Sequence, residues 1–151
     1  MNTLALDLGT QCGFACSCGK SGVWNLKALS SESIGQRYVK FQHHLETHFR
    51  ACYIIEIVYE EVKFHRGVDA AHVYGALEGL LQKFCIDNEI EYRGIGVSTI
   101  QKVATGRGMA PKGQKKKMMF EAAVREFKSV NIISEDHADA LWILQAATKP
   151  I

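Results

Sequence analysis

The fold class can be inferred from the pattern of residues 2–28, NTLALDLGTQCGFACSCGKSGVWNLKA. Its start reads as a β-strand of about six residues that ends in the Gly-Thr turn at Gly9 and Thr10. Glycines at positions 13, 19 and 22 punctuate the segment that follows, which indicates two further short strands. The stretch therefore predicts a meander of three strands at the start of the chain.

Farther along, segments with helical spacing of apolar residues alternate with short strand-like runs. Helices are expected over 33–50, 70–87, 114–127 and 134–147, and strands over 52–62 and 90–97. A meander followed by alternating helices and strands is typical of an α/β fold with a mixed sheet. No repeat, low-complexity tract or linker divides the sequence, so we expect one domain over residues 1–151.

The composition is that of a globular protein. The chain has 151 residues, of which 47% are hydrophobic and 23% charged, enough to bury one substantial core. It has no apolar run of about 18 residues and no basic N-terminal region followed by an apolar stretch. We therefore expect a cytoplasmic protein without membrane contacts.

The cysteines favour reduced thiols. There are five, an odd number in a chain without a secretion signal. Cys12, Cys16 and Cys18 are close in the sequence, whereas Cys52 and Cys85 stand alone. Zinc sites usually have a second Cys/His pair nearby, so we expect small buried thiols in a strand rather than a zinc site.

The closing segment SEDHADALWILQAA, residues 134–147, carries acids at the entrance of an apolar helix. Ser134 is a suitable N-cap, and acids in a first turn usually complement the helix dipole. Asp136 and Asp139 are three apart, so they project from one face. Asp139 lies deeper, beside the apolar stripe, where a pair of like charges requires a cation.

Two further acids stand at the ends of predicted strands, where ligand groups gather in α/β sheets. Asp7 is near the end of the first strand and Glu60 near the end of the fourth. Together with the helix pair they offer hard oxygen ligands that suit Mg²⁺ or Mn²⁺. Two such ions about 3.5–4 Å apart activate a water and stabilise the leaving oxygen of a phosphodiester.

Each acid also has a plain structural explanation. Asp7 could cap a turn and Glu60 could be an exposed strand end. Glu61 occupies an odd position, on the face of the strand that carries the apolar residues, so Glu60 is the better candidate ligand. Glu56 lies further inside the strand and is expected to have a structural role. The metal-site hypothesis therefore depends on the four acids occurring together and not on any one of them.

The net charge is only +2, but basic residues are concentrated in one block of the sequence. Such a block is most often a solvated helix face, but beside clustered carboxylates it suits a polyanionic substrate. The block comprises Lys102, Arg107, Lys112, Lys115, Lys116 and Lys117.

Four segments carry a family resemblance: LALDLGTQCGFA (4–15), IVYEEV (57–62), VSTIQKVATGRGMAPKGQKKKMM (97–119) and EDHADALWIL (135–144). In this order they resemble RuvC-type Holliday junction resolvases, over nearly the whole chain. The resemblance implies the RNase H-like three-layer fold, with a five-stranded mixed sheet flanked by helices. The small, cysteine-rich form resembles the phage or other viral branch, whose members act inside the host cell.

The resemblance also implies an activity: a crossover junction endodeoxyribonuclease that resolves four-way junctions by paired symmetric nicks, leaving 5′-phosphate ends. Asp7, Glu60, Asp136 and Asp139 match its catalytic metal ligands, which hold two Mg²⁺ ions for which Mn²⁺ can substitute. His137 is a possible substitute in the closing pair, and Glu61 remains a rival of Glu60.

The implied DNA contacts include Lys112, which matches the basic residue after the glycine turn, together with the rest of the basic block. The family lysine upstream of that turn corresponds to Gln101 or Lys102. The family also places an aromatic residue three positions after the catalytic Glu to probe the junction centre. Here Lys63 occupies that position and Phe64 follows it, which departs from the pattern.

Symmetric cutting requires two identical sites, so we expect a homodimer, with the broad apolar helix over 70–87 as its interface or as part of the monomer core. One alternative is a broader nuclease that debranches forks, flaps and loops. A second is a junction-binding module without activity. A third is a sugar kinase or actin-type ATPase, suggested by DLGTQCG, but those folds need two such domains.

Overall fold

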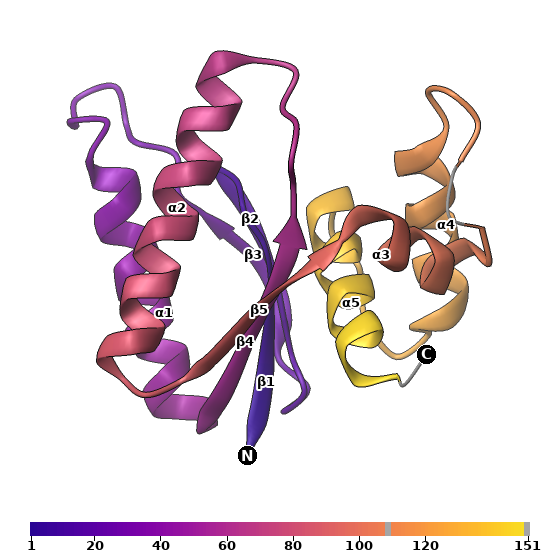
Figure 1. Cartoon of the computed structure of the whole chain (residues 1–151), viewed down its shortest axis with the longest axis horizontal. Helices are drawn as coiled ribbons and strands as arrows, with labels where there is room; N and C mark the ends of the chain where they lie inside the picture. Colours follow the sequence, from indigo (N-terminus) through magenta and orange to yellow (C-terminus); the bar gives the residue numbers. More distant parts are fainter. Residues whose placement is uncertain (108–109, 150–151) are drawn as a thin grey trace.

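The computed structural model describes residues 1–107 and 110–149 (Figure 1). Its strands form one sheet in the order β3-β2-β1-β4-β5, with β1 antiparallel to β2, β2 antiparallel to β3, and β4 parallel to both β1 and β5. The strands are β1 (Asn2–Asp7), β2 (Gln11–Cys16), β3 (Ser21–Asn25), β4 (Ile54–Glu61) and β5 (Glu91–Gly96). The helices are α1 (Gln36–Cys52), α2 (Val68–Asp87), α3 (Val97–Thr105), α4 (Lys115–Glu126) and α5 (Glu135–Thr148).

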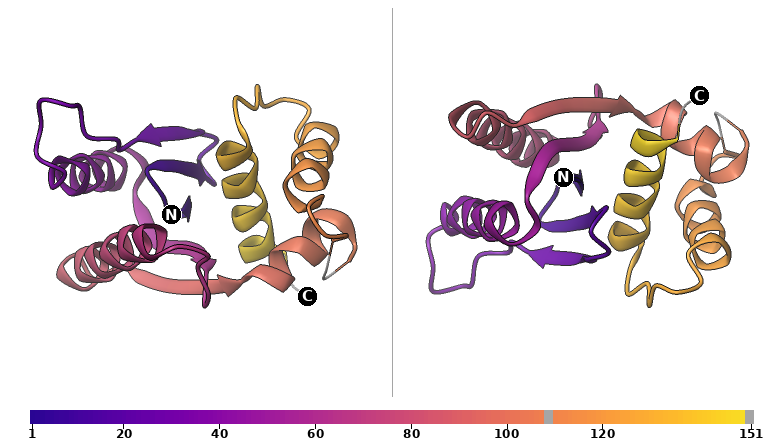
Figure 2. Two further views of the ribbon diagram at one scale, coloured as in Figure 1. Left: turned by 90° about the horizontal axis from the view of Figure 1, so that it is seen from above. Right: turned by 90° about the horizontal axis from the view of Figure 1, so that it is seen from below.

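Helices cover both faces of the sheet, which confirms the expected three-layer α/β architecture. Helices α1 and α2 lie on one face, and α5 lies on the other with α3 and α4 outside it (Figures 1 and 2). In the described ranges, none of the helices has both the length and the apolar character that crossing a bilayer requires.

The alternation of side chains along β1 and β4 divides the core between the two faces. Leu4 and Leu6 pack with Ile57 and Tyr59 toward α1 and α2. Ala5 and its partner Val58 face α5 and pack with Ala138, Trp142 and Ile143. Because the period is two, every second residue after Ala5 and Val58 also faces α5.

The short side chains on the α5 face allow the helix to lie close to the sheet. A Cβ atom at Gly13 would lie 1.9 Å from the backbone oxygen of Asp136, so β2 requires glycine at this position. Ala140 is fully buried against the same part of the strand. Gly13 thus sets the position of the first turn of α5.

The observed elements differ from the predicted ones at several points. Gly13 and Gly22 lie inside strands, and Gly19, at φ +95°, is in the turn between β2 and β3. The first helix begins at Gln36, after Ile34, which is 67% exposed. Tyr53 precedes β4 and adopts a left-handed conformation at the end of α1, so it is not part of the strand.

Helix α3 was not predicted. Val97 was expected to end a strand, and residues 98–104 were assigned to no element. Val97, Thr99 and Val103 are β-branched residues of low helix propensity, and Gly106 follows closely. The helix forms because Ile100 and Gln101 are buried on its inner face. Tertiary burial therefore overrides local propensity in this segment.

Candidate metal centre and nucleic-acid interface

The sheet brings Asp7 and Glu60 to one edge. Asp7 lies two residues after Ala5 and Glu60 two residues after Val58, and Ala5 and Val58 are paired neighbours in parallel strands. Both acids therefore face α5 at the carboxyl ends of their strands. Glu61 lies one residue later, on the opposite face, and is exposed. The structure thus favours Glu60 over Glu61 as a neighbour of Asp7.

Helix α5 brings the second pair of acids to the same place. Asp7, Glu60, Asp136 and Asp139 all line one cavity of about 210 Å³. Gln11, Lys115 and Lys116 complete its polar lining. The four acids predicted from the sequence therefore meet in space, from three separate elements.

The start of α5 is fixed by its own hydrogen bonds. The Ser134 hydroxyl accepts a hydrogen bond from the backbone N–H of His137 (3.2 Å), as the predicted N-cap requires. His137 Nδ1 accepts from the backbone N–H of Ile133 (3.2 Å), so Nε2 carries the proton and donates to the Ser21 hydroxyl (2.8 Å). His137 is 2% exposed and ties α5 to β3, so it lies outside the carboxylate cavity.

Burial and mutual repulsion make this cavity costly for negative charge. Burial, then Asp139, Glu60 and Asp136, raise the pKa of Asp7 well above its usual value. Burial, then Glu60, raises the pKa of Asp139 to about 7, against the influence of Lys116 and Lys115. A bound divalent cation would remove this repulsion, so the donor set fits Mg²⁺ or Mn²⁺.

The carboxylates surround the cavity rather than a single point. Among the described residues, three cysteines have donor atoms that all lie within 4.8 Å of one another. No three of these acids come that close together. The four acids therefore line a shared cavity and do not converge on one compact centre.

Two lysines of α4 lie at the cavity. Lys115 Nζ is 3.7 Å from Glu60 Oε1, and Lys116 Nζ is 3.6 Å from Glu135 Oε2. The carboxylates, led by Asp139, raise the pKa of Lys116 despite its partial burial. The Lys116 ammonium therefore stays charged beside the cavity that the carboxylates line.

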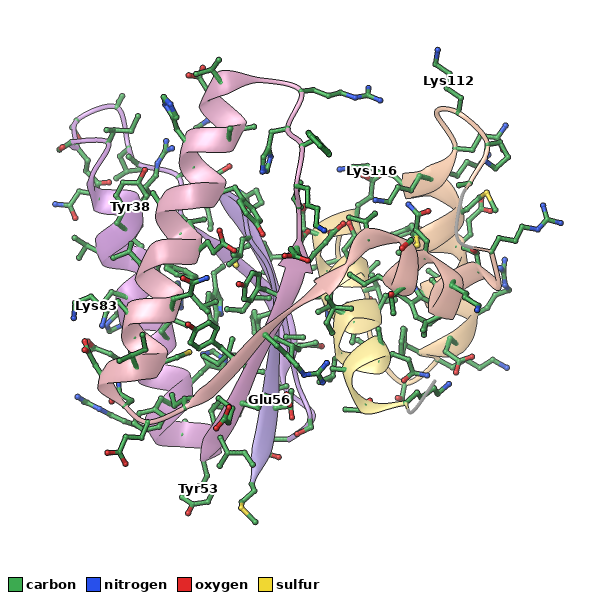
Figure 3. All side chains as sticks on the ribbon, in the orientation of Figure 1. Tyr38, Tyr53, Glu56, Lys83, Lys112 and Lys116 are labelled. Carbon is green, nitrogen blue, oxygen red and sulfur yellow. The ribbon has the colours of Figure 1, made fainter. Side chains whose placement is uncertain are left out.

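The other predicted basic residues lie away from the cavity. Lys117 pairs with Glu121 (3.9 Å) along α4, and Lys102 and Arg107 are exposed. Lys112 is at the tip of the loop before α4, whereas Lys116 points back toward the sheet (Figure 3). Residues 108–109 of the glycine turn, ATGRGMAPK, lie outside the described residues.

A groove of about 520 Å³ lies between the end of β4 and α3. Lys63 and Phe64 line it together with Glu61, Ser98 and Gln101. The Phe64 ring is 92% exposed, so it is available to stack on a ligand. Lys63, at the position of the family's junction-probing aromatic residue, and Phe64 after it therefore lie just beyond the strand that carries Glu60.

Glu56 has the structural role expected of it. Its carboxylate accepts hydrogen bonds from the Thr3 hydroxyl (3.0 Å) and from Arg93 Nε (2.8 Å). It lies near the start of β4, far from Lys116 (Figure 3). Its hydrogen bonds therefore link β4 to β1 and β5.

A second cavity, which no sequence pattern indicated, lies on the other side of the Gly9–Thr10 turn. This cavity, of about 420 Å³, is lined by Arg37, His65 and Asp69 among others. Arg37 Nε and His65 Nε2 are buried there without a hydrogen-bond partner among the described residues. Arg37 reads as an ordinary helix residue in the sequence, because only the fold brings α1 beside this turn.

Comparisons with known proteins bear on the fold. No protein-family model matches the sequence, and no curated protein matches it. Thermus thermophilus RuvC in complex with Holliday junction substrate matches with a TM-score of 0.75 at 17% identity, over 97% of this chain and 92% of that chain. The fold is that of RuvC-type resolvases.

Two further solved structures also share this fold. Thermus thermophilus RuvC matches with a TM-score of 0.73 at 16% identity, over 97% of this chain and 92% of that one. The yeast mitochondrial Holliday junction resolvase Ydc2 matches with a TM-score of 0.63 at 13% identity, over 95% of this chain and 76% of that one. The resemblance in four sequence segments is thus confirmed at the level of the RNase H-like fold.

Proposed function

We propose that the chain is a metal-dependent endonuclease that resolves four-way DNA junctions by paired symmetric nicks. The observation that carries the proposal is the cavity lined by Asp7, Glu60, Asp136 and Asp139 at the carboxyl ends of β1 and β4. The structural neighbours support the substrate class, because one of them is in complex with Holliday junction substrate.

The acids would hold two Mg²⁺ ions, for which Mn²⁺ could substitute. Ions bound there supply Lewis acidity toward a phosphodiester and lower the pKa of a bound water. The chain itself contributes position and charge. Gly13 and Ser134 fix the start of α5, and Lys115 and Lys116 attract the scissile strand to the acids.

The DNA would run across the carboxyl edge of the sheet. Lys102, Arg107, Lys112 and Lys117 are exposed outside the cavity and would contact phosphates. On the other side, Lys63 and the exposed Phe64 border the groove beside β4, where an aromatic ring can stack on an unpaired base.

We further propose that one domain of residues 1–151 acts as a homodimer in the cytoplasm. A two-fold dimer places two identical sites at a fixed separation, as paired nicks require. Tyr74, Leu77, Leu81 and Phe84 of α2 are buried in the monomer core. Any interface on α2 would therefore use its outer face and its ends.

A cleavage assay tests the proposal. A synthetic four-way junction, a fork and a plain duplex are incubated with the protein in Mg²⁺ or in EDTA, and cut positions are mapped on denaturing gels. We expect paired symmetric nicks in the junction, only with Mg²⁺, and loss of cleavage without loss of binding in Asp7→Asn. Cleavage that persists in EDTA or in Asp7→Asn would contradict the proposed chemistry.

Adjacent acids on β4 offer a matched pair of variants. Glu60→Gln removes a cavity ligand, so its cleavage rate should fall by about two orders of magnitude or more. Glu61→Gln changes an exposed residue on the opposite face and should cleave at nearly the wild-type rate. The reverse ranking would show that Glu61 is the ligand.

A second candidate is a less selective nuclease that also cuts forks and flaps. The observation that favours it is Lys63, which stands where the family has its junction-probing aromatic residue. Comparable cutting of the fork and the junction in the same assay would support this broader activity. Tight binding in Mg²⁺ without any cutting would instead support a binding module.

A further inference from the structure

Three cysteines gather at the end of the sheet opposite the carboxylates. Cys16 ends β2, Cys18 is in the turn to β3, and Cys52 ends α1. Their sulfur atoms all lie within 4.8 Å of one another. Cys52 is distant from the other cysteines in the sequence, but the fold returns α1 to the β2–β3 turn and brings Cys52 beside Cys16 and Cys18.

Hydrogen bonds hold this corner together. Asn2 Nδ2 donates to the backbone oxygen of Cys52 (2.6 Å), and the Ser17 hydroxyl donates to Asn2 Oδ1 (3.0 Å). The corner lies beside the first residue of β1, roughly 16 Å along the strand from Asp7. Tyr53, next to Cys52, marks this end of the molecule in Figure 3, and Lys116 marks the other.

We propose that Cys16, Cys18 and Cys52 form a structural binding site for Zn²⁺, with three thiolate ligands and a fourth position open to solvent. Thiolates select soft or borderline cations such as Zn²⁺, whereas Mg²⁺ takes oxygen. The site is therefore chemically distinct from the carboxylate cavity and does not depend on the proposed nuclease function.

The geometry is close to what zinc requires. Zn–S bonds of about 2.3 Å in a tetrahedral site separate two sulfurs by about 3.8 Å. Sulfurs within 4.8 Å of one another reach that separation by small side-chain rotations. Cys16 and Cys52 are buried and Cys18 is exposed, so the ion can enter from the side of Cys18.

The turn also provides the surroundings that a bound thiolate needs. The backbone N–H of Cys18 donates to Cys16 Sγ (3.4 Å), and Gly19 takes the positive φ that the tight turn requires. Lys20 would balance the single negative charge of Zn²⁺ with three thiolates.

Occupancy would join the β2–β3 turn to the end of α1. The unfolded chain lacks the assembled site, so zinc should stabilise the folded state. At about a hundredfold excess of free zinc over its Kd, the melting temperature should rise by roughly 5–10 °C.

Cobalt titration tests the site. The fully reduced full-length protein is titrated with Co²⁺, whose thiolate charge-transfer bands report sulfur ligands, and Zn²⁺ is then added to displace it. We expect one equivalent with thiolate bands that zinc abolishes. The bands should be lost in Cys18→Ser, a change at an exposed residue that leaves the core intact.

Two control variants test whether the cobalt bands come from this cysteine cluster. Cys85→Ala removes a thiol outside the cluster and should bind one equivalent as before. Asp7→Asn should also retain the thiolate bands, even though we expect it to abolish cleavage. Absence of thiolate bands in the reduced wild-type protein, or equal bands in Cys18→Ser, would overturn the proposal.

Discussion

Asp139 lies one turn into α5, where the cavity wall and Glu60 both oppose its ionisation. Burial and Glu60 raise its pKa to about 7, and the same environment raises that of Asp7. A carboxyl of this kind destabilises the metal-free protein when it is ionised and becomes useful when a cation is bound. The metal-free protein is thus less stable because it keeps a carboxylate site that can bind a cation.

The first prediction concerns this residue and pH. The folded pKa of Asp139, about 7, exceeds its ordinary value of 3.8, so its favourable contribution is complete below about pH 4 and is lost as pH rises through 7. In EDTA, Asp139→Asn should gain stability over wild type across that range, by at most about 4 kcal/mol. Denaturant titrations at several pH values measure the difference.

Added Mg²⁺ provides the internal control for this experiment. It should stabilise the wild-type protein more above pH 7 than at acid pH, because protons compete with the ion for the carboxylates. A constant difference between wild type and Asp139→Asn at every pH would show that the carboxyl does not titrate in this way.

Single residues also mark what the sequence could and could not reveal about the site. Asp7, Glu60, Asp136 and Asp139 were predictable, because strand ends and helix spacing place them without knowledge of packing. Arg37 and the approach of Cys52 to Cys16 were not, since both arise from the return of α1 to the sheet. Contacts between distant segments leave no local periodicity.

At the scale of elements, the seating of α5 on β2 decides whether the acids meet. Helix α5 packs on β1 and β2, and the close approach at Gly13 leaves no space for another side chain. His137 fixes the helix laterally by its hydrogen bond to Ser21. The strands provide half of the acids, and this contact aligns the other half.

The second prediction compares two glycines. Gly13→Ala should lower the free energy of unfolding by about 1–3 kcal/mol or more and reduce cleavage, because the new Cβ displaces the first turn of α5. Gly75→Ala, in α2 with nothing within 4 Å of the new atom, should raise stability by about 0.5–1 kcal/mol. Equal effects would mean that the contact at Gly13 does not constrain the helix.

The third prediction concerns α4, whose first residues face the cavity. In an Asp7→Asn background that binds without cutting, Lys116→Ala should weaken junction binding and reduce the slope of log K against log salt by about 1. Lys117→Ala removes the same charge from a residue that does not line the cavity, and it should change the slope less. Binding curves at several salt concentrations provide the slopes, and identical slopes would remove Lys116 from the DNA contact.

Elements also show where sequence patterns succeed and fail. Strand β4 and helix α2 were predicted because their apolar residues repeat with the period of their secondary structure, whereas the meander was predicted from the glycines that follow the first strand. Helix α3 was missed because β-branched residues and a following glycine outweigh the short inner face of Ile100 and Gln101. A nine-residue helix offers too few turns for its periodicity to dominate.

At the scale of the whole molecule, the sheet separates two different chemistries. Hard carboxylates lie at the carboxyl ends of β1 and β4, and thiols lie at the opposite end of β1 and β2. Lys115 and Lys116 line the first end, Lys112 stands farther out on the loop before α4 (Figure 3), and this is the end proposed to meet DNA. The second end could hold a structural ion without access to the substrate.

Manganese scattering in crystals tests most directly the claim that the four acids hold catalytic cations. Crystals soaked in Mn²⁺ should show two anomalous peaks, about 3.5–4 Å apart, bounded by Asp7, Glu60, Asp136 and Asp139. The same soak of Asp7→Asn crystals should lose at least one of them. An empty cavity at Mn²⁺ concentrations that support cleavage, with ions bound elsewhere, would contradict the account.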